Sequence, residues 1–400
     1  MVFLVLAGVV LVAHFYLWHR MVRSTTGPGR LRKALTWGFV GLAGLLAATF
    51  AGTRTAEWHW LAWPGYLWLA LLFYLLVFFV VLEIPRAVAG SFLRTPVRAP
   101  EPVAVMAGAP APAAPVEPPA PAPMSRRLFL GRTTAAIAGA GALGTVGYGL
   151  TSALGDPVLE SVKIALPKLD PRLSGLRFAV VSDIHLGPLT GRSHTERIVR
   201  MINGLEADVV AIVGDLVDGS VADLGPLAQP LRSVESRYGA YFVTGNHEYF
   251  APNGPAEWIE ELGQLGVRSL RNERVEIRHQ GAVLDLAGVN DLNGASANDG
   301  PDFDKALGNR DTSRSTVLLA HQPVQVDQAA RHGVDLQLSG HTHGGQLAPF
   351  NLVVGLQQPV VSGLATIDGV QVYVTRGAGF WGPPVRVGAP PEITMLELRA

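Results

Sequence analysis

The chain has 400 residues, 48% of them apolar and 16% charged, and its formal net charge at pH 7 is zero. This length allows two or three structural units, and the excess of apolar residues indicates membrane-spanning segments beside a globular part. Because the chain contains no cysteine, disulfides, thiolate metal sites and cysteine nucleophiles are excluded.

The net charge of zero hides an asymmetry along the chain. Residues 1–154 carry 12 Lys/Arg against 4 Asp/Glu, a net of +8, and residues 155–400 carry 20 against 28, a net of −8. Since binding to a nucleic-acid backbone depends on clustered positive charge, the acidic part argues against a nucleic-acid partner. The basic part has the charge bias of membrane-flanking segments.

Three uncharged apolar runs follow one another near the N-terminus, at residues 2–18, 34–53 and 61–82. Each is close to the ~20 residues that a transmembrane helix needs, and three in succession are hard to explain as buried core helices. Tryptophans gather near the ends of these runs, as they do at membrane interfaces: Trp18, Trp37, Trp58, Trp60 and Trp63. We therefore predict a membrane region with three helices over residues 1–94.

The positions of Lys and Arg predict the orientation of this region. Only Arg54 separates the second and third runs, whereas the other basic residues lie between the first two runs or after the third: Arg20, Arg23, Arg30, Arg32, Lys33, Arg86, Arg94 and Arg98. By the positive-inside rule these two segments are cytoplasmic, so the N-terminus lies outside.

A Pro/Ala-rich stretch at residues 95–124 predicts an extended linker. Arg126 and Arg127 then precede a mildly apolar run, and two interpretations of residues 125–154 stay open. The twin arginine resembles a Tat export signal, here behind three membrane spans, or the segment is a fourth transmembrane helix with a basic flank. Both interpretations place the rest of the chain outside the cytoplasm, as the large domain of a multi-pass protein of the cell membrane.

Residues 155–400 have the composition of one globular domain. Patterns typical of helices occur at 196–205, 256–265 and 324–331, between short runs typical of strands. These runs are 178–181, 209–213, 241–243, 283–289, 316–320, 336–338, 370–374 and 393–398. The alternation predicts an α/β or layered α+β domain with largely buried sheets.

Polar residues follow five of the predicted strands, within residues 182–187, 214–219, 245–248, 320–323 and 340–343. Because ligands in open α/β sheets bind beyond the carboxyl ends of the strands, five such ends imply one shared site. They provide seven donor side chains: Asp183, His185, Asp215, Asn246, His321, His341 and His343. Taken singly each has a structural explanation, such as a helix N-cap for the aspartates, but together they indicate a metal centre.

The donor types indicate which metals the site would hold. Imidazole with carboxylate and amide oxygen suits Zn²⁺, Mn²⁺ or Fe, whereas Ca²⁺ or Mg²⁺ alone favours oxygen ligands. Seven donors are too many for one tetrahedral ion. If Asp215 bridges, two divalent ions each receive four protein ligands.

The series D-x-H, G-D-x-x-D, G-N-H-E, H and G-H-T-H, within residues 175–345, resembles the calcineurin-like metallophosphoesterase superfamily. The tail at residues 375–379 and 390–393 looks like its membrane-anchored or exported bacterial branch, some members of which carry Tat signals. The resemblance implies two packed β-sheets flanked by helices. It also implies one ion held by Asp183, His185 and His343, a second held by Asn246, His321 and His341, and Asp215 as the bridge.

Catalytic roles follow from the same resemblance. His247 matches a histidine that faces the phosphoryl group, Glu248 would orient His247, and Asp218 matches the motif without a defined role. We expect hydroxide, formed from water between the two cations, to attack phosphorus in line while His247 stabilises the charge or protonates the leaving group. The predicted enzyme is a membrane-tethered, extracytoplasmic hydrolase of phosphomono- or phosphodiesters, including lipid-linked or envelope phosphoesters.

Alternatives remain open at this stage. The chain could be a non-catalytic metal-binding membrane sensor or scaffold, although the complete donor set with His247 favours an enzyme, or it could be a nucleotide phosphodiesterase. Arg376 could pair with a substrate phosphate or with a carboxylate. Phe380 and Trp381 could form an apolar wall or cover the core, and the loop at residues 295–300 could rim the site.

Overall fold

A computed structural model describes residues 2–52, 56–92 and 125–400. The described residues form two compact units, one drawn from 1–44 and 68–145 and the other from 45–67 and 146–400. The predicted linker at 95–124 and three of the orientation-setting residues, Arg54, Arg94 and Arg98, lie outside the described residues.

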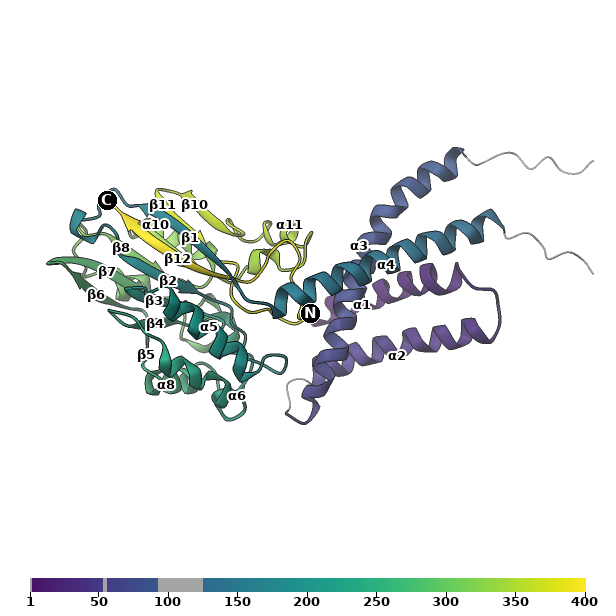
Figure 1. Cartoon of the computed structure of the whole chain (residues 1–400), viewed down its shortest axis with the longest axis horizontal. Coiled ribbons are helices and arrows are strands. Elements are labelled where there is room, and N and C mark those ends of the chain that lie inside the picture. Colours follow the sequence, from purple (N-terminus) through teal and green to yellow (C-terminus); the bar gives the residue numbers. More distant parts are fainter. Residues whose placement is uncertain (1, 53–55, 93–124) are drawn as a thin grey trace, which may run out of the picture. The chain divides into compact units, whose positions relative to one another are not determined.

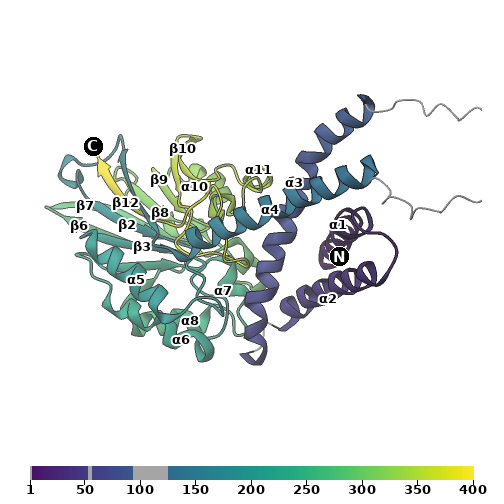
Figure 2. The same cartoon turned by 45° about the vertical axis from the view of Figure 1, so that its right-hand side comes forward.

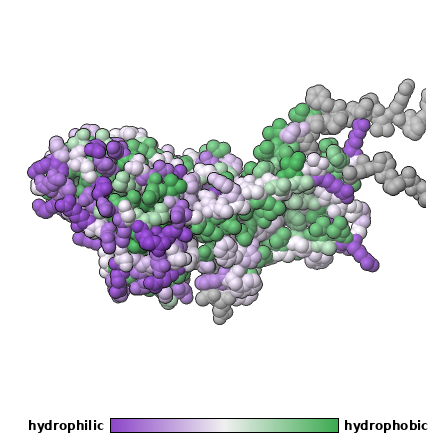
Figure 3. Space-filling view, viewed as in Figure 1, coloured by the Kyte–Doolittle hydropathy of each residue, from purple (hydrophilic) through white to green (hydrophobic). Residues whose placement is uncertain are grey.

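The N-terminal part is helical. Helix α1 (Val2–Trp18) continues into a π-helical turn (His19–Arg23), and α2 covers Arg30–Gly52. A 3₁₀ turn (Ala56–Leu61) leads into α3 (Ala62–Phe92), and α4 covers Arg126–Leu154. Their surfaces are mainly hydrophobic, in contrast to the largely hydrophilic surface of the globular domain (Figure 3).

Three helical segments in the described part of the chain are long and apolar enough to cross a membrane: Arg30–Gly52, Trp58–Pro85 and Arg126–Leu154. They correspond to the predicted second, third and fourth spans. Helix α1, with 17 residues, is not among them, so its role as a span stays a prediction. The chain therefore has the features of a membrane protein, and the number and direction of its crossings remain predictions.

Polar contacts join α1 and its continuation to α3. Arg20 forms an ion pair with Glu83, and the Tyr16 hydroxyl donates to the same carboxylate at 3.2 Å. The indole of Trp68 donates to Nε2 of His14 at 3.0 Å. These pairs satisfy the hydrogen-bonding groups of Arg20, Glu83 and His14 within the apolar unit.

The globular domain contains two six-stranded mixed sheets (Figure 1). The first has the order β1-β12-β2-β3-β4-β5, with β2, β3, β4 and β5 parallel and β12 antiparallel to β2. Its strands are β1 (Val158–Ala165), β12 (Glu392–Arg399), β2 (Arg177–Val181), β3 (Val209–Val213), β4 (Ala240–Val243) and β5 (Val267–Ser269).

The second sheet has the order β10-β11-β9-β8-β7-β6, and β11, β9, β8 and β7 are parallel. Its strands are β10 (Gly363–Ile367), β11 (Val370–Val374), β9 (Leu336–Ser339), β8 (Thr316–Leu319), β7 (Ala282–Gly288) and β6 (Glu273–His279). In both sheets the central parallel strands end on the same side, which places their following loops along one edge.

Helices cover the outer faces of both sheets (Figures 1 and 2). The first sheet is covered by α5 (Arg192–Gly204), α6 (Val221–Ala228) and α8 (Ala256–Gln264), and the second by α9 (Phe303–Leu307) and α10 (Val326–Arg331). Two short helices, α7 (Asn246–Phe250) and α11 (Asn351–Val354), lie in loops. The 3₁₀ turns are η3 (Pro171–Leu173), η4 (Gln229–Ser233), η5 (Leu292–Ala297), η6 (Pro323–Gln325) and η7 (His343–Gly345).

The core consists of three apolar layers. The central one joins the inner faces of the sheets, with Phe178 and Val180 of β2 packed among residues such as Leu284 and Leu286 of β7. The outer layers bury the helices, for example Trp258 of α8 and Phe303 of α9. The predicted fold class, two packed sheets flanked by helices, is confirmed, and the eight predicted strands are all present.

Candidate metal centre

The loops after five parallel strands bring the seven expected donors together. From the first sheet, β2 is followed by Asp183 and His185, β3 by Asp215 and β4 by Asn246. From the second sheet, β8 is followed by His321, and β9 by His341 and His343. The carboxyl ends of both sheets therefore meet at one site, as the sequence pattern implied.

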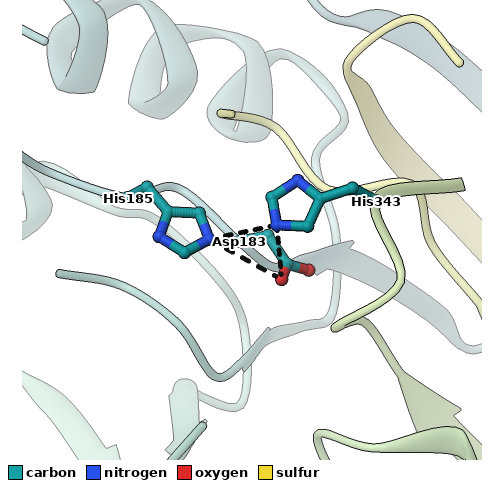
Figure 4. Close-up of side chains that lie close together, drawn as sticks. All are labelled: Asp183, His185 and His343. Carbon is teal, nitrogen blue, oxygen red and sulfur yellow. Dashed lines mark hydrogen bonds and ion pairs between the residues drawn. The ribbon is translucent and has the colours of Figure 1, made fainter. Parts of the chain in front are cut away.

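The first group of donors is Asp183, His185 and His343, whose ligand atoms all lie within 4.8 Å of one another. Nε2 of His185 is 3.1 Å from Nε2 of His343, and Nε2 of His343 is 3.4 Å from Oδ1 of Asp183. Figure 4 shows both rings turned toward the Asp183 carboxylate. All three residues are buried, and this close group of one carboxylate and two imidazoles is a donor set that a divalent cation would fit.

A second group, Asp215, His321 and His341, meets the same 4.8 Å criterion. Nε2 of His321 lies 3.1 Å from Oδ2 of Asp215, and the His321 and His341 rings are 5.1 Å apart. Asp215 also belongs to a third group with His185 and His247, and its Oδ2 is 3.9 Å from Nε2 of His185. Asp215 thus lies between the first two groups, where a bridging carboxylate would have to be.

Asn246 has a side-chain oxygen at the site that is unpaired in the described part of the chain. The side chain is buried, and its Oδ1 has no hydrogen-bond partner among the described residues. An unsatisfied buried acceptor costs free energy unless a ligand compensates it. Together with the carboxylates and imidazoles, this oxygen makes a donor set that fits divalent transition metals.

The backbone at the donors is held in a rarely used conformation. Five of them have positive φ: Asp183 (53°), His185 (49°), Asp215 (49°), His341 (72°) and His343 (52°). Non-glycine residues adopt this left-handed region uncommonly, and each instance costs of order 1–3 kcal/mol that the surrounding structure must offset. Such strain is typical of functional sites because it aims several side chains at one point.

Glycines beside the donors permit close approach of the loops. A Cβ on Gly245 would lie 2.2 Å from Oδ1 of Asp215, and one on Gly340 would lie 2.0 Å from the hydroxyl of Ser182. These contacts explain why glycine precedes Asn246 and His341 in the motifs.

Asp218 orients two histidines at once. Its Oδ1 lies 2.7 Å from Nδ1 of His247 and 2.9 Å from Nδ1 of His185, so both Nδ1 atoms donate to it. The Nε2 atom of each ring is not bonded to Asp218. In His185 this atom is available to a metal, and in His247 it is available to a substrate. Although partial burial raises the pKa of Asp218, the charges of the two imidazoles hold it below its usual range.

The His247 imidazole is the expected phosphoryl-facing group, and its charge state follows from these neighbours. Burial lowers the pKa of His247, but the carboxylates of Asp215 and Asp218 outweigh it and raise the pKa to about 9. The backbone N–H of His247 also donates to Oδ1 of Asp215 at 2.8 Å. These hydrogen bonds thereby fix the His247 ring, and the two carboxylates favour its protonated form.

Glu248 does not make the contact that was expected of it. Its carboxylate accepts backbone N–H groups from Gly245 (2.6 Å), Leu216 (2.8 Å) and Asp215 (3.1 Å), and no hydrogen bond joins it to His247 in the described part of the chain. Glu248 lies in the first turn of α7, where a carboxylate caps free amides. Asp218, and not Glu248, orients His247.

Arg376 pairs with carboxylates, which was the structural alternative. Its guanidinium donates to Glu392 at 2.5 Å and to Glu160 at 2.6 Å. Phe380 is buried in the core, whereas Trp381 is 56% exposed and its ring lies 6.0 Å from that of His247. Of Phe380 and Trp381, Trp381 is therefore the residue that could form an apolar wall beside His247.

The loop at residues 295–300, which the sequence suggested as a rim of the metal site, begins in η5. With α9 and α10 it lines a separate groove of about 740 Å³, and the lining residues include none of the seven donors. Asp299 in this loop accepts hydrogen bonds from Tyr249 and Asn290, which hold it against the neighbouring loops. Because η5 also lies against α7, which carries Asn246 and His247, the place of this loop at the rim of the metal site stays a prediction.

Sequence reasoning missed Arg386, which is fully buried behind His343. Its Nη1 donates to the His343 carbonyl at 2.8 Å, its Nη2 lies 3.2 Å from Nδ1 of His343, and its Nε donates to the Gly379 carbonyl at 3.0 Å. Burial lowers the pKa of Arg386 to about 10. A usable signal was present, because Arg386 is the only charged residue in the Gly/Pro-rich stretch 377–391.

Sequence comparison finds known proteins that are similar to this chain. The model of the calcineurin-like phosphoesterase family matches residues 176–345. A Danio rerio protein named transmembrane protein with metallophosphoesterase domain is 41% identical over 261 residues, covering 63% of this chain and 60% of that protein. An uncharacterized metallophosphoesterase from Helicobacter pylori is 40% identical over 262 residues, covering 64% of this chain and 68% of that protein.

The chain spans about three fifths of the length of the Danio rerio relative. Among solved structures, a dimetal phosphatase from Danio rerio is similar to 56% of this chain and 93% of its own, with a TM-score of 0.38 and 11% identity.

Proposed function

Because this chain belongs to the calcineurin-like phosphoesterase family, a family of phosphoric ester hydrolases, we propose that it is a membrane-tethered phosphoesterase with a dinuclear metal site. The observation that carries the proposal is that two groups of donors lie next to each other. Asp215 belongs to one of these groups and also lies close to His185 of the other. Asp183, His185 and His343 would hold one ion, Asn246, His321 and His341 the other, and Asp215 would bridge them. Mn²⁺, Zn²⁺ and Fe all suit this donor set.

Bound ions would supply the Lewis-acid charge that activates water and neutralises phosphoryl oxygens. The chain's own contribution centres on His247. With Nδ1 donating to Asp218, Nε2 of His247 is the atom that stabilises developing charge or gives its proton to the leaving oxygen. Glu248 contributes indirectly, by fixing the backbone at Asp215 and Gly245.

The catalytic domain is proposed to lie outside the cytoplasm, attached through α4. The basic segments near residues 20–33 and 86–98 support this orientation, whether residues 125–154 are a fourth span or a twin-arginine signal. A domain in that place would meet envelope or lipid-linked phosphoesters. As the chain lacks cysteine, the orientation can be tested with Asp304→Cys, an exposed site, and a membrane-impermeant maleimide on whole cells. Labelling only after lysis would contradict the proposal.

Hydrolysis itself is tested with the purified full chain. Bis(p-nitrophenyl) phosphate and p-nitrophenyl phosphate, with added Mn²⁺, separate diesterase from monoesterase activity, and elemental analysis gives the metal content. We expect metal-dependent hydrolysis that chelation abolishes. A chain that binds metal tightly but hydrolyses neither compound would instead be a non-catalytic sensor or scaffold.

A further inference from the structure

The segment after His343 differs from the rest of the globular domain because it is uncharged and apolar at its surface. Residues 344–367 contain no Asp, Glu, Lys or Arg. Within them α11 and the next turn expose Leu352 (71%), Val353 (52%) and Leu356 (87%) to solvent. Adjacent exposed apolar side chains on a domain surface mark a contact with an apolar partner.

This segment is fixed to the metal-binding loop at both of its ends. A Cβ on Gly345 would lie 2.4 Å from Cα of Asn351, so the backbones of η7 and α11 are in direct contact. Further along, the Thr342 hydroxyl donates to the carbonyl of Val361 at 2.7 Å. The apolar tip at residues 352–356 is therefore held beside the site.

Two further exposed apolar side chains flank His247. The rings of Phe250 and Trp381 lie 5.4 Å and 6.0 Å from the His247 ring, and 63% and 56% of these residues are exposed. Gln346, three residues after His343, fixes the Trp381 loop: its amide accepts from the Trp381 N–H at 3.0 Å and donates to the Trp381 carbonyl at 2.9 Å. The Trp381 backbone is held by these hydrogen bonds while its side chain is exposed. Contact with a ligand would therefore cost little conformational entropy of the loop.

The chain itself indicates which apolar partner is present. Helix α4, one of the segments apolar enough to cross a membrane, ends at Leu154, and β1 begins at Val158. The three residues between them span at most about 11 Å when extended. A domain tied this closely to a helix that is apolar enough to cross a membrane would stay within reach of the lipid surface.

We propose that Phe250, Leu352, Val353, Leu356 and Trp381, here called the apolar rim, insert into the lipid surface around the metal site. The phosphoester that reaches His247 is then the headgroup of a membrane lipid, whose apolar carbons contact Phe250 and Trp381. This choice of substrate rests on the proposed phosphoesterase function, whereas insertion of the rim does not.

Insertion is tested by single-cysteine labelling, which the cysteine-free chain allows directly. Leu356→Cys and the control Asp304→Cys, whose side chain is 95% exposed outside the rim, are labelled with an environment-sensitive fluorophore in the full chain reconstituted in phosphatidylcholine–phosphatidylglycerol vesicles. Nitroxide-bearing lipids should quench the probe at 356 several-fold more than the probe at 304, and aqueous iodide should do the reverse. Equal quenching at both positions would overturn the proposal.

The substrate choice is tested with Leu352→Ser/Leu356→Ser. Removing two large apolar groups from a lipid contact should lower hydrolysis of vesicle-embedded phosphatidic acid or phosphatidylglycerol by about tenfold. Hydrolysis of bis(p-nitrophenyl) phosphate, measured on the same preparation, should stay within a factor of about two, since Leu352 and Leu356 are 71% and 87% exposed and neither is a donor. The proposed lipid substrate is wrong if both the unmodified chain and the variant hydrolyse bis(p-nitrophenyl) phosphate but neither hydrolyses the lipids. It is also wrong if the variant hydrolyses the lipids as fast as the unmodified chain does. If the unmodified chain hydrolyses nothing, the proposed function fails instead.

Discussion

The two sheets contribute different chemistry to the same site. Loops of the first sheet supply the carboxylates and the amide, Asp183, Asp215 and Asn246, whereas loops of the second supply only imidazoles, His321, His341 and His343. Each proposed ion takes donors from both sheets. The site therefore depends on the packing of the sheets against each other, which the central apolar layer provides.

The pKa values of the donors also differ from residue to residue. Burial and the neighbouring His321 lower the pKa of His341 to about 3, and burial with the Arg386 guanidinium lowers the pKa of His343 well below its usual range. These imidazoles are therefore neutral, the state in which histidine binds metals. Burial lowers the pKa of His321, but the carboxylates of Asp215 and Asp183 outweigh it and raise that pKa well above its usual range. The first sheet thus brings the carboxylates and the second brings imidazoles of unequal pKa, a contrast that the following variants can break or sharpen.

The largest effect is expected for Asp215→Asn, which removes the charge nearest to both donor groups. We expect loss of most bound metal and a fall in phosphodiester hydrolysis greater than the ~10²–10⁴-fold that loss of a single acid or base costs. Elemental analysis and the kcat for bis(p-nitrophenyl) phosphate measure both. Asp304→Asn, at an exposed aspartate outside the site, is the matched control. Full metal content in Asp215→Asn would show that this carboxylate is not a bridge.

Replacing His247 should separate chemistry from metal binding on the first sheet. His247→Ala is expected to keep its metal while kcat falls by ~10²–10⁴-fold, because the proton donor or charge stabiliser is gone. His332→Ala changes a histidine that lines the separate groove and serves as the control. An unchanged kcat would refute the role of His247, and loss of metal would make it a ligand.

A smaller effect is expected at Arg386, which positions a donor from the second sheet. Lysine keeps the charge but cannot reproduce the several hydrogen bonds of the guanidinium. Arg386→Lys should therefore weaken metal binding by about 10–100-fold, the range found for residues that orient ligands. Titration of activity against free Mn²⁺ gives the affinity, and kcat at saturating metal should change little. An unaltered metal affinity would contradict the positioning role.

The smallest effect concerns His194 on α5, which is buried and is not itself one of the seven donors. Burial and Arg197 lower its pKa to about 4. Because the unfolded chain takes up this proton near pH 6.5 and the folded chain only near pH 4, the unfolded state binds more protons between these values, and stability falls as the pH drops through this window. The full loss is about 3 kcal/mol.

His194→Gln should remove that pH dependence. Thermal unfolding of the full chain, with metal chelated, would be compared at pH 7 and pH 5. Chelation removes the contribution of pH-dependent metal release, and the comparison with His194→Gln separates His194 from the other titrating groups. The unmodified chain should lose more stability than His194→Gln, and identical pH profiles would be the contrary result.

The central fold could be predicted from sequence, but its edges could not. The four strands that the patterns missed, β1, β5, β6 and β10, are the two edges of each sheet. Edge strands face solvent on more than one side, so they lack the continuous apolar runs of β2 or β3. Central strands are recognisable because burial on both faces dictates their composition.

The seven donors of the site could be predicted from the sequence, but the residues that orient them could not. All seven donors are at strand ends in recognisable motifs, whereas the exchange of roles between Asp218 and Glu248 depends on hydrogen-bond geometry. Asp218 lies close in sequence to Asp215 and far from His247, and nothing in the spacing indicates which carboxylate reaches the ring. Arg386 was missed for the same reason, since its partners are mainly backbone carbonyls.

The most direct test of a two-ion site shared between the sheets is the metal stoichiometry of the purified full chain beside His343→Ala and His341→Ala. The account predicts two equivalents of divalent metal per chain, and about one in each variant, because each loses a donor of a different ion. One equivalent in the unmodified chain, or variants that both keep two, would contradict it.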